Sequence, residues 1–171
     1  MTKKVAAYSE ILYHLINFRT EQFQQLKKMV GIDYDSFMIL SVMGAHYLKH
    51  NNKLGSDWDA VWEDVRTSKI DEFYTARKLT IYAVSNMLNL PRETVRRKIE
   101  ILKKKKLINH STTIGLLPTN KTEDLMKPFA EIELKTLSKF LKSLKKNGTL
   151  DAVLNYYCLL YTSPSPRDSD S

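Results

Sequence analysis

The amino-acid sequence predicts a mainly α-helical fold with one small β-hairpin. Apolar residues recur at helical spacing along most of the chain, whereas β-branched residues around a turn-like centre occur near residue 112. The chain has 171 residues and 43% of them are apolar, enough for one domain with a sizeable core and flanking helices. No apolar run approaches the roughly eighteen residues that a membrane-spanning helix needs.

Two helices are predicted in the first third of the chain. Residues 5–29 form a long helix, which Gly31 ends. Asp33 or Asp35 can cap a second helix that runs to about Lys49. One broad apolar face of the first helix carries Ile11, Leu12, Leu15, Phe18, Phe23 and Leu26.

A short amphipathic helix is predicted for DWDAVWEDV, residues 57–65. Trp58 and Trp62 are one turn apart on its apolar face. They are candidates for lining a small-molecule pocket, although packing between helices is the expected role. His46 and His50 are also one turn apart, but no third ligand accompanies them, so we expect no metal site.

The segment YAVSNMLNLPRETVRRKIEIL predicts two helices joined by a tight turn. Thr80 or a neighbour begins the first helix, and Ser85 is small where the two helices cross. Asn89 can adopt the left-handed conformation that the turn requires, and Pro91 suits the first position of the second helix. The expected buried residues are Val84, Leu88, Val95, Ile99 and Leu102.

The remaining elements are a hairpin and a long helix. INHSTTIGLLP, between Leu107 and Pro118, has the composition of a small β-hairpin. Thr122 is expected to begin a helix that runs to about Lys146, and Gly148 to close it. Its predicted apolar stripe is Leu125, Phe129, Ile132, Leu137, Phe140, Leu141 and Leu144.

The positive charge of the chain is concentrated in one segment. The formal net charge is +8. Residues 77–121 carry eleven basic and two acidic side chains, whereas residues 1–76 carry nine and ten, and residues 122–157 carry six and five. A local excess of this size favours an acidic partner such as nucleic acid.

The second helix of the predicted pair carries side chains suited to reading DNA bases. Its N-terminal end, the end that enters a major groove, exposes Arg92, Glu93, Arg96 and Arg97. Arginine binds guanine O6 and N7, and glutamate accepts from cytosine N4. Further along, Lys103 and Lys104 are candidates for phosphate contacts. Alternatively, they form a solvated helix end that favours the helix dipole.

These motifs resemble the winged helix-turn-helix of bacterial transcription regulators. PRETVRR is similar to the recognition helix of the catabolite-activator family, which implies base contacts by Arg92, Glu93 and Arg97 and a phosphate contact near Thr94. No β-rich cyclic-nucleotide domain precedes the motif. The order of the helices is more similar to MarR-type regulators, in which both ends of the chain form a dimer interface. Lys106 stands where many such domains carry glycine.

Four segments are expected from these patterns. Residues 1–76 form an N-terminal helical region for packing and dimerisation, and residues 77–121 form the winged helix-turn-helix DNA-binding domain. Residues 122–157 form a C-terminal helical dimerisation region, truncated after its last residue. Residues 158–171, which hold the only cysteine, resemble a translated sequencing adapter and are expected to be disordered.

The sequence therefore predicts a sequence-specific transcriptional regulator of bacterial type, a cytoplasmic homodimer that binds double-stranded DNA. Its recognition helix spans residues 91–106. One alternative is a plasmid or phage replication or partition protein that binds DNA, and another is a winged-helix module that binds proteins. No glycine-rich phosphate loop, metal-ligand set or nucleophile with a placed base occurs in the sequence, so neither enzymatic activity nor a cofactor is expected. Nothing in the sequence identifies a small-molecule effector.

Overall fold

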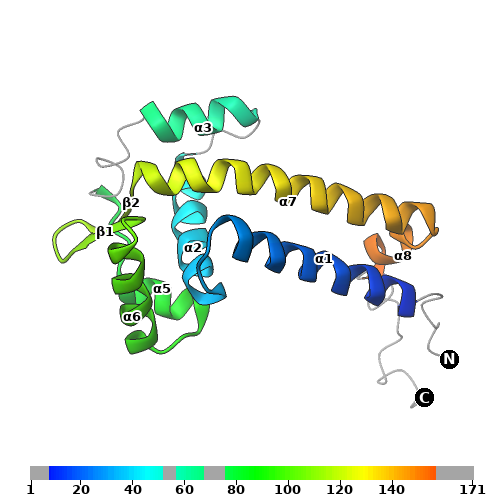
Figure 1. The fold of residues 1–171 in the computed structure, drawn as a ribbon, viewed down its shortest axis with the longest axis horizontal. Coiled ribbons are helices and arrows are strands. Elements are labelled where there is room, and N and C mark those ends of the chain that lie inside the picture. Colours follow the sequence, from blue (N-terminus) through cyan, green and yellow to red (C-terminus); the bar gives the residue numbers. More distant parts are fainter. Residues whose placement is uncertain (1–7, 52–56, 68–75, 157–171) are drawn as a thin grey trace, which may run out of the picture. The chain divides into compact units, whose positions relative to one another are not determined.

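The computed structural model describes residues 8–51, 57–67 and 76–156 (Figure 1). In chain order its elements are α1 (Tyr8–Met29), α2 (Tyr34–Asn51), α3 (Trp58–Thr67), α5 (Ile81–Leu88), α6 (Arg92–Lys104), β1 (Ile108–Ser111), β2 (Gly115–Pro118), α7 (Asn120–Lys146) and α8 (Leu150–Leu154). This confirms the prediction of a mainly α-helical chain with one antiparallel hairpin. Within the described ranges, no helix has the length and apolarity needed to cross a membrane. The adapter-like segment 158–171 lies outside these ranges.

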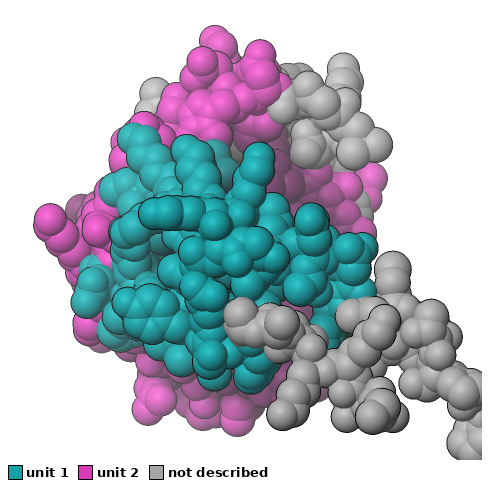
Figure 2. Space-filling model, turned by 90° about the vertical axis from the view of Figure 1, so that its right-hand side faces the viewer, with its two compact units in different colours: residues 1–24, 132–171 teal, residues 25–131 magenta. Residues whose placement is uncertain are grey.

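The chain divides into two compact units, which Figure 2 distinguishes by colour. The first, drawn in magenta in Figure 2, comprises residues 25–131 and contains α2, α3, α5, α6, the hairpin and the beginning of α7. The second, drawn in teal, comprises residues 1–24 and 132–171 and contains most of α1, the rest of α7, and α8. The 25–131 unit includes the predicted DNA-binding segment, residues 77–121, and extends beyond it at both ends.

The connection from α1 to α2 follows the two local signals in the sequence. Gly31 has a φ of 65°, a left-handed conformation that glycine adopts without strain. Asp33 accepts hydrogen bonds from the Ser36 amide at 3.1 Å and the Ser36 hydroxyl at 2.9 Å, so it caps α2. The Lys98 ammonium of α6 lies 2.9 Å from the same carboxylate. Asp33 therefore both begins α2 and ties it to α6.

We expect Asp33→Asn to remove a pH-dependent contribution to stability. Burial raises the pKa of Asp33, but hydrogen bonds from Lys98 and Ser36 outweigh that effect and hold the pKa below the ordinary value of 3.8. Such a carboxyl stabilises the fold above its unfolded-state pKa, and this contribution is lost as pH falls through the folded-state pKa. Asparagine still caps the helix. Urea unfolding should show the variant less stable than wild type at neutral pH, with the difference shrinking in acid; a difference independent of pH would contradict the ion pair.

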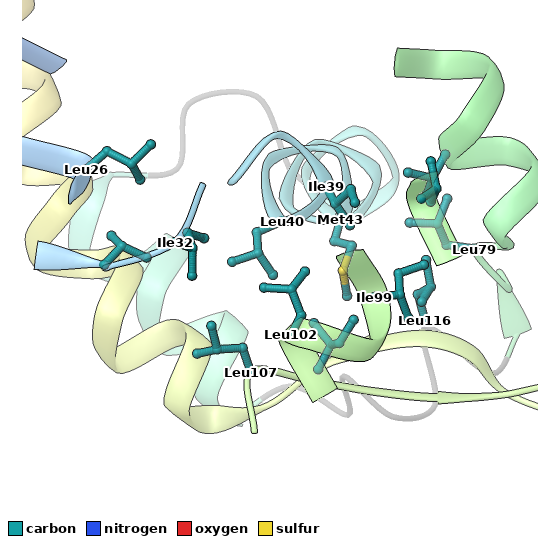
Figure 3. Close-up of a cluster of buried hydrophobic side chains, with 14 of the residues drawn as sticks. Leu26, Ile32, Ile39, Leu40, Met43, Leu79, Ile99, Leu102, Leu107 and Leu116 are labelled. Carbon is teal, nitrogen blue, oxygen red and sulfur yellow. The ribbon is translucent and has the colours of Figure 1, made fainter. Parts of the chain in front are cut away.

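The core of the 25–131 unit joins α2, α6 and the hairpin (Figure 3). Ile39 and Met43 of α2 and Ile99 and Leu102 of α6 are each at most 1% exposed, and Leu116 of β2 is 0% exposed. Burial of each such side chain stabilises the fold by about 1.5–3 kcal/mol relative to exposure. This shared core holds the helix with the candidate DNA-reading side chains against the rest of the unit.

The start of α7 differs from the prediction. The helix begins at Asn120 rather than at Thr122. The Thr122 hydroxyl donates to the Leu107 carbonyl, and the Thr119 hydroxyl donates to the same oxygen at 3.1 Å. Both threonines therefore fasten the start of α7 to the chain just before the hairpin. Thr122, where the sequence placed the start of the helix, therefore lies in its first turn and makes a tertiary contact.

The hairpin is anchored at Gly115, where β2 begins. This residue has a φ of 77°, and the next amide, that of Leu116, donates to the Leu79 carbonyl at 2.9 Å. A Cβ atom on Gly115 would lie 2.6 Å from that same carbonyl oxygen. Glycine is therefore needed here both for its conformation and for the close approach of two backbones. The register pairs are Ile108–Pro118, Asn109–Leu117, His110–Leu116 and Ser111–Gly115.

We expect Gly115→Ala to destabilise the protein more than Gly31→Ala, its matched control. Both glycines have positive φ, which costs an L-residue about 1–2 kcal/mol. A Cβ atom on Gly31 meets nothing within 4 Å, whereas one on Gly115 meets Leu79 backbone, so only the second variant adds a steric conflict. Urea denaturation of the two variants measures the difference in free energy of unfolding. Equal losses would show that the backbone contact at Gly115 relaxes without cost.

The second unit is built on antiparallel packing of α1 against α7, which lie side by side in Figure 1. The rings of Phe18 and Phe140 stack with centroids 5.2 Å apart, and Gln22 donates to Glu133 at 3.0 Å. Burial raises the pKa of Glu133, and the bond from Gln22 opposes this. Several large apolar side chains of this unit remain exposed: Leu12, Ile16 and Phe23 of α1, and Leu134, Leu137 and Leu141 of α7.

Candidate nucleic-acid interface

α5 and α6 are joined by a tight turn whose chemistry was predicted from the sequence. Thr80 caps α5 by accepting a backbone hydrogen bond at 3.1 Å, and Asn89 ends it in the left-handed conformation with φ 51° and ψ 41°. Ser85 is 7% exposed, and its hydroxyl donates to the Leu90 carbonyl at 2.6 Å. Pro91, predicted as the first helical position, is the N-cap of α6, and the helix ends at Lys104 rather than at residue 106. These contacts fix the position at which α6 begins.

α6 has one buried face and one exposed face. Val95, Ile99 and Leu102 are each 0% exposed and hold the helix in the core. Side chains on the rest of the helix reach solvent, and those at its N-terminal end are mostly charged. The exposed candidate residues are Arg92, Glu93, Arg96, Arg97 and Lys104.

The guanidinium of Arg92 stacks on an aromatic ring of α5. Its Cζ atom lies 4.2 Å from the centroid of the exposed Tyr82 ring. A cation above a tyrosine face at this distance is attracted by the ring quadrupole. The pKa of Tyr82 is lowered by a hydrogen bond with Asn86 and by the charge of Arg92. The ring restricts the conformations of Arg92, which remains exposed.

Glu93 and Arg96 form a bidentate ion pair one helical turn apart. Arg96 Nε donates to one carboxylate oxygen at 2.9 Å and Arg96 Nη2 to the other at 2.6 Å. The hydrogen bond from Arg96, together with the charges of Arg96 and Arg97, lowers the pKa of Glu93. Both side chains of the pair remain more than half exposed, so the pair contributes little to stability. Its consequence is local: it orients the Glu93 carboxylate and favours its ionised form.

The other predicted contact residues differ in exposure. Arg97 is exposed on the N-terminal half of α6, whereas Thr94 is half-buried. Lys103 is half-buried and lies 3.1 Å from Glu100, so part of its charge is compensated within the helix. Lys104 is exposed near the C-terminal end. The structure thus gathers the arginines at one end of the helix and places the two lysines two to three turns away.

Two features near this surface were not predicted. The stacking of Tyr82 on Arg92 was missed, although an exposed aromatic residue on the preceding helix was a signal that could have suggested it. Lys98 was counted only as part of the basic segment, yet it is mostly buried and paired with Asp33. Nothing in the local sequence indicates that partner, because the two residues lie on different elements far apart in the chain.

The hairpin lies directly after α6 and carries further polar groups. The Lys78 ammonium donates to the Thr112 carbonyl in the hairpin turn. Lys106, which precedes β1, has a φ of 59°, a conformation that glycine adopts more readily. Burial lowers the pKa of His110, and the charge of Lys103 adds to the effect. Lys106 thus makes the turn that joins α6 to the hairpin.

The structure also bears on the histidine pair, of which the His46 side chain is described and the His50 side chain lies outside the described residues. The His46 ring nitrogen Nε2 is 2.8 Å from the Arg77 carbonyl, so a backbone contact occupies it. Throughout the part of the chain that the structure describes, no three His, Cys, Asp or Glu side chains are grouped as a metal site would require.

Comparison of the chain with models of protein families, with curated proteins and with solved structures yields no match.

Proposed function

We propose that the protein is a sequence-specific transcriptional regulator of bacterial type that binds double-stranded DNA through a winged helix-turn-helix. In this proposal α6 is the recognition helix and the β1–β2 hairpin is the wing. The observation that carries it is the N-terminal end of α6. There Arg92, Arg96 and Arg97 are exposed on a helix that is held in the core by the fully buried Val95, Ile99 and Leu102.

The positions of these side chains suit base recognition. A recognition helix contacts base edges with its N-terminal residues, and arginine is the residue that binds guanine O6 and N7 most often. Arg92 is held by the Tyr82 ring and Glu93 by Arg96, so two candidate base-reading groups are oriented before DNA binds. Orientation in advance reduces the entropy lost on binding.

Charge supports the same proposal. Residues 77–121 carry eleven basic and two acidic side chains, and Lys104 is exposed beyond the arginines. Basic side chains bind phosphates without regard to sequence, fixing the register of the protein on the duplex. The proposal extends to a cytoplasmic location and to a binding role without enzymatic chemistry.

Salt-dependent binding tests this proposal against the alternatives. Wild-type protein is titrated into a labelled random-sequence duplex at several salt concentrations. We expect affinity to fall linearly in a double-logarithmic plot, with a slope close to the number of phosphates contacted. Absence of DNA binding at low salt would refute the proposal and favour a protein-binding module. A replication or partition role would also give this binding, and it is distinguished by whether the selected site regulates transcription.

We further propose that the protein acts as a homodimer through the second unit. Its exposed apolar side chains include Ile16 and Leu134, which are 52% and 51% exposed, and they lie on helices packed against each other. Clusters of exposed large apolar residues commonly mark protein interfaces. A two-fold dimer also matches the symmetry of palindromic DNA sites.

Sedimentation equilibrium measures the dimer directly. At a protein concentration of about tens of micromolar, the wild-type protein should sediment as a dimer. Ile16→Glu and Leu141→Glu should shift it to monomer, because each places a charge in the apolar surface. Ile101→Glu, an exposed position in the 25–131 unit, is the control and should stay dimeric. A monomeric wild type, or equal effects of all three variants, would contradict this interface.

A further inference from the structure

We propose that a pocket between α2, α3 and the start of α7 binds a small apolar molecule of one or two rings. The pocket lies within the 25–131 unit and has a volume of about 180 Å³. Its walls include Leu40, Met43, Gly44, Trp62, Pro118 and Met126. The regulatory consequence argued below rests on the proposed DNA-binding function, whereas binding to the pocket does not.

The chemistry of the walls favours an apolar occupant. Almost all of the lining surface is apolar. Its polar side chains are Ser41, Tyr47, Thr122 and Glu123, and each of them already has an interaction inside the protein. Ser41 donates to the Phe37 carbonyl at 3.0 Å, and Thr122 donates to the Leu107 carbonyl. A water molecule is held well only where two to four polar partners surround it. The pocket is therefore better suited to an apolar molecule than to ordered water.

The size of the pocket limits the occupant. Cavities of about 150 Å³ with leucine, isoleucine and phenylalanine walls are large enough to bind benzene. At about 180 Å³, this pocket has room for a substituted single ring or a compact pair of fused rings. Trp62 supplies an aromatic wall, which favours contact with a flat ring.

A glycine keeps part of the space open. Gly44 lies in the interior of α2, where glycine is less favourable than alanine. A Cβ atom added to it would meet nothing within 4 Å. No steric reason on α2 therefore requires glycine at this position. Gly44 is exposed and lines the pocket, so a leucine at this position adds apolar atoms beside the pocket without a clash within α2.

The pocket shares residues with the elements that position α6 and the hairpin. Leu40 and Met43 form its α2 wall and belong to the buried cluster that includes Ile99 and Leu102 of α6. Pro118, at the end of β2, forms another part of the wall. An occupant that displaces these side chains moves the supports of the recognition helix and the wing. Its expected effect is a change in DNA affinity.

Toluene is the probe for binding. Its saturation-transfer NMR signal and its effect on tryptophan fluorescence, to which both Trp58 and Trp62 contribute, are measured for wild type, Gly44→Ala and Gly44→Leu. Wild type and the alanine variant should bind saturably, and the leucine variant should bind at least about tenfold more weakly because its side chain fills the space. Thermal melting checks that the leucine variant is folded. If Gly44→Leu fails to fold, Val61→Phe is used in its place, because Val61 is another wall residue and the larger side chain also fills the pocket.

The outcomes separate the two parts of the proposal. Absence of saturable binding to wild type, or equal binding by wild type and the filling variants, overturns the pocket assignment. DNA affinity is then measured with and without saturating toluene, and an unchanged affinity overturns the regulatory part. If no DNA binding occurs under any condition, the proposed function fails, and the toluene measurements still decide whether the pocket binds its ligand.

Discussion

Replacing Ile99 with alanine is expected to lower the free energy of unfolding by about 2–5 kcal/mol. Ile99 is 0% exposed and belongs to the cluster that joins α6 to α2 and β2. Truncating it removes buried methyl groups and leaves a cavity that the surrounding helices fill only in part. The effect is expected to be large because a single buried cluster holds the 25–131 unit together.

Ile101→Ala on the same helix is the matched control. This isoleucine is 37% exposed, so the same chemical change should cost much less. Urea denaturation gives the free energy of unfolding of both variants. If the slope of this free energy against urea concentration is the same as in wild type, the denatured states are comparable. Equal losses at the two positions would mean that α6 does not present its Val95–Ile99–Leu102 face to the core.

The second large effect is expected at Arg97 and concerns DNA binding. Arg97→Ala should cost about 1–3 kcal/mol on the preferred site and relax discrimination at particular base pairs. The reason is that Arg97 is exposed in the N-terminal half of α6, the end that the proposed function places in the major groove. The same result is expected for Arg92→Ala, since the guanidinium above Tyr82 is already oriented.

Lys104→Ala is the control that distinguishes recognition of the base sequence from electrostatic attraction to the DNA backbone. Lys104 is exposed at the C-terminal end of α6, where a recognition helix leaves the groove. Loss of a phosphate contact weakens binding to all sequences alike and lowers the salt slope by about one unit. Competition binding at several salt concentrations distinguishes the two patterns. If the arginine and lysine variants lose affinity equally on specific and random duplexes, α6 attracts DNA without reading it.

Local chemistry explains why much of the 25–131 unit was predictable from the sequence. The cap at Thr80, the left-handed Asn89 and the glycine end of α1 each depend on a few consecutive residues. The buried face of α6 follows from helical spacing, and Val95 and Ile99 lie where that spacing places them. Such signals need no knowledge of the tertiary structure.

Features that depend on distant residues were not predictable. The Lys98–Asp33 pair ties α6 to the start of α2, and the Thr122 hydroxyl fastens the start of α7 to the Leu107 carbonyl. A helical pattern also identifies an apolar face without saying what covers it. For this reason Leu137 was assigned to an apolar stripe, yet it remains 39% exposed in the described chain.

Selection of bound sequences from a random pool of duplexes tests the central claim most directly. It is carried out in parallel with wild type and Arg97→Ala. Recognition of bases by α6 predicts that wild type enriches a defined motif and that the variant loses preference at particular positions within it. Binding without an enriched motif, or the same motif from both proteins, would contradict the assignment of α6 as a helix that reads DNA sequence through Arg97.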